Sequence, residues 1–302
     1  MNGLSFIICS VISFLLAAAL GWTELSFIAK NWRDVILAAN VFAWLLTGLA
    51  FVKGRMAPSY KYDTRENDSY ISDIWRGIEL HPRFGAAWDL KIFHNRRWTI
   101  AALAMIDISF AALQWEIHGY ITCTMICVML LRNLLTVNLF VNEEWYLYST
   151  DVCDEPFGFY FAWGSGVCFP TIYTLQTQYL AMNPVELPLI HTISILSLGV
   201  IGFMVYYIAT EQKKAVCDTK GVHDVGDEKA QFIRASYKTT DGVERESLLL
   251  CSGPWKHIRH PNYLGLLVLT CTMDERNCVR KYGKDWEVYC RRVRWRLVLG
   301  LY

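Results

Sequence analysis

Six long apolar stretches alternate with polar segments along the first two thirds of the chain. They cover residues 4–20, 35–52, 98–114, 120–141, 157–175 and 187–209. A helix needs roughly 20 predominantly apolar residues to cross the hydrocarbon core of a bilayer, and each stretch approaches that length. The pattern therefore predicts an all-α polytopic membrane protein, with a bundle of about six transmembrane helices in residues 1–210.

Composition and charge support a membrane protein. The chain is 54% hydrophobic, with a net charge of +1. Lys and Arg are abundant in residues 53–97 and 210–302 and absent from the links 115–119, 142–156 and 176–186. The positive-inside rule places the Lys- and Arg-rich segments in the cytosol, and six spans then place the N-terminus there too. The first stretch lacks the basic flank and small-residue cleavage site of a signal peptide, so we interpret it as a span.

Polar residues inside the apolar stretches are candidates for function. Asp107 lies within the third stretch, and Asn133 and Asn138 lie in the fourth. A carboxylate in hydrocarbon is costly, so Asp107 should face protein or a water-filled cavity. Hydrogen bonding between helices and a polar pocket within the bundle are both open interpretations. The ten cysteines form no C-x-x-C pair, which favours reduced packing residues and predicts no metal site.

The segment after residue 210 has a different pattern. Residues 232–240 (FIRASYKTT) and 243–250 (VERESLLL) flank the dipeptide Asp241-Gly242, which predicts a β-hairpin. The apolar link 263–273 that follows is too short to span a bilayer. We therefore expect residues 211–302 to form a small cytosolic hairpin with a C-terminal tail.

A basic turn follows the hairpin. The stretch SGPWKHIRHPNYLG (252–265) places Lys256, His257, Arg259 and His260 between Trp255 and Tyr263. Lys and Arg pair with phosphate oxygens, and aromatic rings stack on bases. The tail adds Lys281, Lys284 and further aromatic residues. These residues suit a nucleotide with an extra phosphate, although no G-x-G-x-x-G Rossmann motif is present. A membrane-surface anchor is the alternative interpretation of the turn.

Long motifs throughout the chain resemble those of a known family. They are GIELHPRFG with DLKIF (77–93), SFAALQWEIHGYIT (109–122), NEEWYLYSTD (142–151), YTLQTQYLAMNPVEL (173–187), EQK (211–213), FIRASYKTTDG (232–242), LLLCSGPW (248–255) and RHPNYLG (259–265). In these motifs the chain is similar to the sterol reductases, which reduce sterol double bonds with NADPH and include the C14 sterol reductases and the lamin B receptor. The EIHG, WYL and ASYKTTDG motifs resemble the Δ7 branch, which acts on 7-dehydrocholesterol-type sterols.

The resemblance implies an enzyme of sterol biosynthesis in the endoplasmic reticulum membrane. Full-length members would have about ten spans, with NADPH entering from the cytosol and sterol from the bilayer. Membrane lipid and sterol are the expected partners, and nucleic acid is not. The family's NADPH-binding positions map onto Lys213, Leu250, Trp255, Asn262, Tyr263, Asp274, Cys278, Lys281, Tyr282 and Tyr289. Asp274 is also the candidate catalytic residue.

The chain departs from the family pattern at several positions. Cys217 and Leu266 replace a family Arg and Asp, and Met273 replaces an Arg. Leu135 and Asn138 stand where the family has a pocket Tyr, its candidate proton donor, and an Asp. Two spans are missing between Gly265 and Asp274, about 40 residues by span length, so the chain resembles a shortened member with impaired turnover.

Two other functions remain open at this point. Isoprenylcysteine-type membrane methyltransferases resemble the R-H-P-x-Y turn with a late acidic and aromatic tail, and they bind S-adenosylmethionine. The motifs at 77–93 and 173–187 argue against that interpretation. The departures listed above also suit a non-catalytic sterol-binding scaffold.

Overall fold

The computed structural model describes residues 2–60, 64, 69–153, 155–226, 228–238, 244–263 and 282–293. The chain divides into two compact units, Met1–Leu196 and Ser197–Tyr302. The expected functions of the two parts, sterol binding by residues 1–210 and NADPH binding by residues 211–302, stay a prediction.

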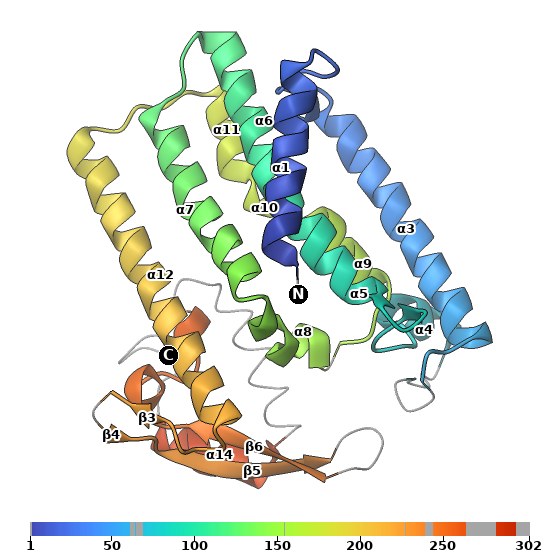
Figure 1. The fold of residues 1–302 in the computed structure, drawn as a ribbon, viewed down its shortest axis with the longest axis vertical. Helices are drawn as coiled ribbons and strands as arrows, with labels where there is room; N and C mark the ends of the chain where they lie inside the picture. Colours follow the sequence, from blue (N-terminus) through green and yellow to red (C-terminus); the bar gives the residue numbers. More distant parts are fainter. Residues whose placement is uncertain are drawn as a thin grey trace. The chain divides into compact units, whose positions relative to one another are not determined.

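The first unit is a bundle of helices that run in alternating directions (Figure 1). Its long elements are α1 (Gly3–Ala19), α3 (Trp32–Met56), α6 (Ile100–His118) and α7 (Cys123–Val141). The short helix α5 (Leu90–Ile92) and the π-helical segment η2 (Phe93–Thr99) extend α6 at its N-terminal end. The remaining helices and strands of the unit are α2 (Phe27–Lys30), α4 (Tyr70–Arg76), β1 (Arg83–Phe84), β2 (Trp88–Asp89), η3 (Glu143–Tyr148), α8 (Thr150–Cys153), α9 (Phe159–Trp163), η4 (Gly164–Cys168), α10 (Phe169–Tyr173) and α11 (Leu175–Met182).

All six predicted apolar stretches are helical. In the described part of the chain, the helices Trp32–Met56, Leu90–His118, Cys123–Val141 and Leu189–Asp218 are long and apolar enough to cross a membrane. Helix α1 has 17 residues, and a turn at Thr174 interrupts the fifth stretch between α10 and α11. The prediction of an all-α polytopic membrane protein is therefore confirmed, with four rather than six helices that meet these length and composition criteria.

The short link between α6 and α7 shows how local sequence sets the helix ends. Gly119 ends α6 with φ +78°, a left-handed conformation that glycine adopts without steric cost. Thr122 then caps α7, because its side chain accepts a hydrogen bond from the Met125 backbone N–H at 3.1 Å. The two helices consequently run antiparallel and adjacent.

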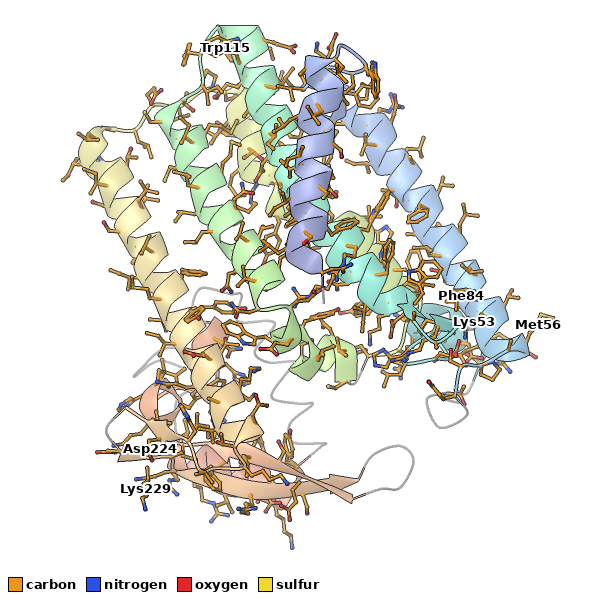
Figure 2. All side chains as sticks on the ribbon, viewed as in Figure 1. Lys53, Met56, Phe84, Trp115, Asp224 and Lys229 are labelled. Atoms are coloured by element: carbon orange, nitrogen blue, oxygen red, sulfur yellow. The ribbon has the colours of Figure 1, made fainter. Side chains whose placement is uncertain are left out.

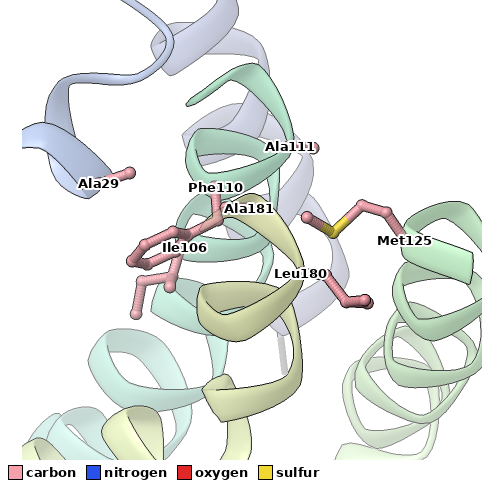
Figure 3. Close-up of a cluster of buried hydrophobic side chains, with 7 residues drawn as sticks. All are labelled: Ala29, Ile106, Phe110, Ala111, Met125, Leu180 and Ala181. Carbon is pink, nitrogen blue, oxygen red and sulfur yellow. The ribbon is translucent and has the colours of Figure 1, made fainter. Parts of the chain in front are cut away.

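Small and branched residues form the main apolar core of the first unit (Figure 3). They come from α2, α6, α7 and α11 and comprise Ala29, Ile106, Phe110, Ala111, Met125, Leu180 and Ala181. Small residues let membrane helices approach closely, and here Ala111 and Ala181 are both buried. This packing fixes α11 against α6 and α7.

The second unit is built around a β-hairpin. Strands β5 (Phe232–Lys238) and β6 (Glu244–Leu250) are antiparallel, with Phe232 opposite Leu250, as the sequence predicts. The Asp241-Gly242 turn and the link 264–273 lie outside the described residues. The unit also contains the C-terminal part of α12 (Leu189–Asp218), strands β3 (Asp224–Val225) and β4 (Glu228–Lys229), the 3-10 turns η5 (Gly253–Lys256) and η6 (Pro261–Tyr263), and α14 (Lys284–Arg292).

The hairpin has apolar side chains on both faces. Leu248 and Leu250 point to one face and pack with α12, while Leu249 and Cys251 point to the other and pack with α14. Successive residues of a strand alternate between faces, so the run LLLC covers both. The hairpin is consequently packed between two helices of its own unit.

Candidate functional site

Three of the predicted cofactor residues lie on the α12 side of the hairpin. Trp255 is 4% exposed, and its Nε1–H donates to the carbonyl of Ala209 at 2.9 Å. The Lys213 ammonium lies 5.0 Å from the centroid of the Trp255 ring, close enough for a cation–π interaction. Leu250 is 2% exposed in the same cluster. Trp255 therefore anchors the basic turn to α12 at the point where the apolar run of that helix ends.

The basic turn then passes to the α14 side of the hairpin. The His260 ring lies 6.5 Å from the Trp286 ring, and Arg259 donates to the Cys290 sulfur at 3.0 Å. Lys256 and His257 between these anchors are exposed. The basic turn thus links the two faces of the hairpin. Trp255 contacts α12, and Arg259 and His260 contact α14.

Aromatic residues line the α14 side. Tyr282 stacks on Trp286 with ring centroids 6.3 Å apart, and its hydroxyl donates to Ser247 at 3.4 Å. Tyr289 follows Trp286 by three residues, and the centroids of the two rings are 4.9 Å apart. Tyr289 is 2% exposed. A cluster of Tyr282, Trp286 and Tyr289 is therefore joined to the basic turn through His260.

Two buried polar atoms on this side have no hydrogen-bond partner among the described residues. They are the Asn262 side-chain oxygen and the Trp286 indole nitrogen. Buried polar groups in native proteins are nearly always hydrogen-bonded. One orphaned acceptor and one orphaned donor beside two basic side chains match the hydroxyl, amide and phosphate groups of a dinucleotide.

A second polar cluster lies within the helical bundle. Asp107 of α6 forms an ion pair with Arg132 of α7, and the Asp107 carboxylate also accepts from the Thr177 hydroxyl at 2.9 Å. Arg132 donates on to Gln176 at 2.7 Å. Asp107 is fully buried, so the costly charge is compensated by a partner, as membrane interiors require. Hydrogen bonding between helices is therefore what the structure shows for Asp107.

Further charged side chains cluster at the end of the bundle where α3 ends. Lys53 pairs with the buried Glu79 at 2.8 Å, and its ammonium lies 5.8 Å from the Phe84 ring centroid. Figure 2 shows Lys53, Met56 and Phe84 together at this end, opposite the end that carries Trp115. Lys91 is fully buried, and its ammonium donates to the carbonyls of Val152 and Glu155.

Asp89 belongs to the same end of the bundle. Burial alone would raise the pKa of its carboxyl, but the hydrogen bond with His81, the Ile92 backbone N–H and the charge of Arg83 together hold that pKa below its usual value. Asp89 is thus ionised at neutral pH and caps the start of α5.

Comparison with known proteins identifies the family. A model of the "Ergosterol biosynthesis ERG4/ERG24 family" matches residues 1–273 and, in a second piece, 265–302. The chain belongs to the ERG4/ERG24 family. The two matched pieces together cover residues 1–302. The resemblance seen in the sequence motifs is therefore confirmed.

Several relatives in this family carry functional names. A "7-dehydrocholesterol reductase" of Danio rerio is 34% identical over 331 aligned residues, which cover 100% of this chain and 69% of the relative. A protein of the same name from Xenopus laevis is also 34% identical, with 70% of it covered. A "Delta(14)-sterol reductase" of Methylotuvimicrobium alcaliphilum is 29% identical, with 74% covered.

The ERG4/ERG24 relatives carry residues that this chain lacks. An alignment of 331 positions against a chain of 302 residues leaves at least 29 positions with no counterpart here. The family model likewise matches in two pieces that overlap at residues 265–273. Both observations are consistent with the segment that the sequence predicts to be missing after Gly265, a position outside the described residues.

The structure gives the following positions for the family's predicted NADPH residues. Lys213, Leu250 and Trp255 lie on one face of the hairpin, and Tyr282 and Tyr289 lie on the other, with Asn262 in the turn η6. Tyr263 belongs to the same turn, and its side chain is outside the described set. Asp274, Cys278 and Lys281 lie outside the described residues. Binding of NADPH by any of these positions stays a prediction.

Sequence reasoning missed two residues that the structure places in polar clusters. Arg132 lies in the fourth apolar stretch as the partner of Asp107, and a lone charge in an apolar run was the signal for it. Trp286 was seen only as one aromatic of the tail, yet it contacts His260, Tyr282 and Tyr289. Its spacing of four and three residues from Tyr282 and Tyr289, which places all three on one helical face, was the available signal.

Proposed function

We propose that the chain is an NADPH-dependent sterol reductase that acts on a ring double bond, the Δ7 bond of 7-dehydrocholesterol-type sterols. The observation that carries this proposal is the full-length similarity to relatives named 7-dehydrocholesterol reductase, at 34% identity. Relatives named Delta(14)-sterol reductase also match the chain, at 29% identity or less. The Δ14 bond is therefore the alternative position of reduction.

The second unit offers suitable groups for NADPH. Asn262 and Trp286 contribute the orphaned acceptor and donor, Arg259 contributes positive charge, and Tyr282 contributes an aromatic face. A planar guanidinium suits a phosphate because it forms paired hydrogen bonds. If held by these residues, NADPH would supply a hydride to one carbon of the double bond, and the other carbon would take a proton from a polar side chain or water.

Trp255, Leu250 and Tyr289 have a supporting part in this proposal. Their side chains are between 2% and 4% exposed and pack against other protein residues. They therefore fix the hairpin between α12 and α14 and so position the turn that carries Arg259 and Asn262. Rigid support for a binding group is as important as the group itself, because a small displacement weakens oriented contacts.

We further propose the endoplasmic reticulum membrane as the location, with sterol reaching the enzyme from the bilayer. The apolar helices and the named relatives support this. The test is conversion of 7-dehydrocholesterol in microsomes of a reductase-null cell that expresses the chain, with a Δ14 sterol offered in parallel. Conversion of the Δ14 sterol alone would assign the other double bond. We expect conversion by the chain as given to be weak, so the same assay is repeated with the relatives' segment inserted after Gly265. Absence of both activities in the inserted form together with tight sterol binding would support the scaffold alternative.

A further inference from the structure

Two more buried polar atoms without a partner among the described residues belong to the first unit, one in α7 and one in η3. They are the side-chain nitrogen of Asn138 and the hydroxyl oxygen of Tyr146, and no hydrogen bond to either is present among the described residues. Asn138 is 7% exposed and Tyr146 is 8% exposed. A buried polar group without a hydrogen bond is destabilising, so two such groups in one region indicate a missing ligand or water.

Arg96 contacts the Tyr146 ring and the backbone of Leu139, the residue that follows Asn138. Its guanidinium lies 4.1 Å from the centroid of the Tyr146 ring, and its Nη1 donates to the carbonyl of Leu139 at 3.3 Å. The Asn138 oxygen already accepts from Asn142 at 2.8 Å, so only the nitrogen of Asn138 remains available. Leu135, which replaces the family's pocket Tyr, lies about one helical turn before Asn138.

The chemistry of the two atoms matches an alcohol. The Asn138 nitrogen can only donate a hydrogen bond, whereas the Tyr146 hydroxyl can donate or accept one. An alcohol has one O–H donor and two acceptor lone pairs, so a single ligand hydroxyl can satisfy both residues.

The position of the cluster matches a membrane-borne alcohol. Helix α7 is long and apolar enough to cross a membrane and ends at Val141, and Tyr146 follows in η3. The cluster therefore lies near the membrane–water boundary, where the polar end of an amphiphile is stable. Leu134 and Val137 on the preceding turns are 38% and 45% exposed and offer an apolar surface to the body of such a molecule.

We propose that Asn138 and Tyr146 bind the 3-hydroxyl group of the sterol substrate. This inference rests on the proposed function for the substrate class and adds the residues that recognise its polar end. The Asn138 nitrogen donates a hydrogen bond to the sterol oxygen. A second hydrogen bond joins the sterol hydroxyl to the Tyr146 hydroxyl, and either group can be its donor. Arg96 is a positioning residue that holds the Tyr146 ring.

The protonation state of Tyr146 agrees with this role. Burial, with a contribution from Asp151, raises the pKa of its phenol above the usual value, against the opposing effect of Arg96. The hydroxyl therefore keeps its proton at neutral pH and remains available as a hydrogen-bond donor.

The test combines a change in the protein with a change in the ligand. The full chain in nanodiscs is titrated with 7-dehydrocholesterol and with its 3-deoxy analogue, for the wild type and for Tyr146→Phe. One neutral hydrogen bond is worth about a two- to tenfold difference in affinity. We expect the wild type to prefer the alcohol by about that factor, and Tyr146→Phe to lose the preference while it binds the deoxy analogue as the wild type does. Asn138→Leu should act in the same way.

The control is Tyr120→Phe, which removes a 46% exposed phenol hydroxyl from the α6–α7 link. It should leave the preference unchanged. If Tyr146→Phe and Asn138→Leu both keep the wild-type preference, or if the wild type has none, the inference is wrong and an internal water satisfies the two atoms. If the wild type converts sterol but shows no preference for the alcohol, the proposed function stands without the inference. If neither ligand binds, both are wrong.

Discussion

Arg132 and Asp107 form an ion pair inside the helical bundle, between α6 and α7. Only 9% of the Arg132 side chain and none of the Asp107 side chain is exposed. Removing one partner of a buried pair leaves an uncompensated charge and typically costs about 3–5 kcal/mol. We therefore expect Asp107→Leu to lower the free energy of unfolding by about that amount, measured by denaturant titration in mixed micelles.

Two further variants test whether the unpaired charge, rather than the lost side-chain packing, causes this destabilisation. The double variant Asp107→Leu/Arg132→Leu should recover most of the lost stability, because apolar replacement of a whole buried pair is often neutral. Glu24→Gln, which alters an exposed ion pair with Lys30, should unfold as the wild type does. A double variant as unstable as Asp107→Leu would contradict an electrostatic role for the pair.

The backbones at Gly77 and Gly158 touch within the first unit. A Cβ on Gly158 would lie 2.3 Å from the Gly77 nitrogen, and neither backbone can move away as a side chain would. We expect Gly158→Ala to lower the free energy of unfolding by about 1–3 kcal/mol. Gly48→Ala on α3, where a Cβ meets nothing within 4 Å, is the matched control and should be neutral or stabilising. Equal effects of the two changes would contradict this close approach.

Acid should destabilise the first unit partly through Asp89. The folded-state pKa of this carboxyl lies below its usual value of 3.8, so Asp89 contributes stability above about pH 4 and loses it as the pH falls below that value. The wild type should lose more thermal stability than Asp89→Asn between pH 5 and pH 3 on that account. Asp34→Asn, at an exposed carboxylate, should follow the wild-type profile. A parallel decline of wild type and Asp89→Asn would refute the assignment.

The proposed NADPH site predicts a preference over NADH. Lys256, Arg259, Lys281 and Lys284 bring positive charge to this unit, and the 2′-phosphate that distinguishes NADPH needs a cationic partner. Arg259 is the member that the structure places beside the α14 aromatic cluster. We expect Arg259→Gln to weaken NADPH binding about ten- to a hundredfold and to leave NADH binding unchanged.

The exposed Lys220 gives the control for that titration, since Lys220→Gln should leave both affinities as they are. Isothermal titration with the two nucleotides is the measurement. Equal wild-type affinity for NADPH and NADH would remove the basis of the proposal.

The segment that the relatives have and this chain lacks predicts weak turnover. A sterol needs a dry and fixed pocket for oriented reaction, and two missing spans would open the pocket to lipid. We expect the 302-residue chain to convert little 7-dehydrocholesterol, and the insertion of the relatives' segment after Gly265 to be the first requirement for rescue. Adding Leu135→Tyr should increase conversion further, because leucine cannot donate a proton. Robust conversion by the chain without the insertion would contradict both expectations.

The sequence predicts the helices and the hairpin because these depend on local patterns. Apolar runs mark the helices, and the Asp241-Gly242 dipeptide between two short candidate strands marks the hairpin of β5 and β6. The π-helical segments η2 and η4 could not be predicted in this way. They meet where His94 contacts Gly166, at a point where a Cβ on Gly166 would lie 2.8 Å from the imidazole. Such a fit depends on contacts between residues far apart in the sequence.

The candidate site was predictable only in part. The motif positions gave Trp255, Asn262 and Tyr282 as members of one cofactor site, but not their distribution over two faces of a hairpin. That distribution depends on the turn between them and on two helices that pack from opposite sides. The unsatisfied atoms of Asn138 and Tyr146 were equally hidden, because their burial depends on contacts with other elements, such as that of Tyr146 with Arg96.

The hydrogen bond from Trp255 to Ala209 also bears on how the protein is made. The two residues are 46 positions apart, a short loop that closes quickly compared with long-range contacts. All the buried residues of the α12 face of the hairpin lie at or before Trp255 in the chain. The hairpin can therefore dock on α12 without α14, and the packing of α14 on the opposite face can follow as a later step.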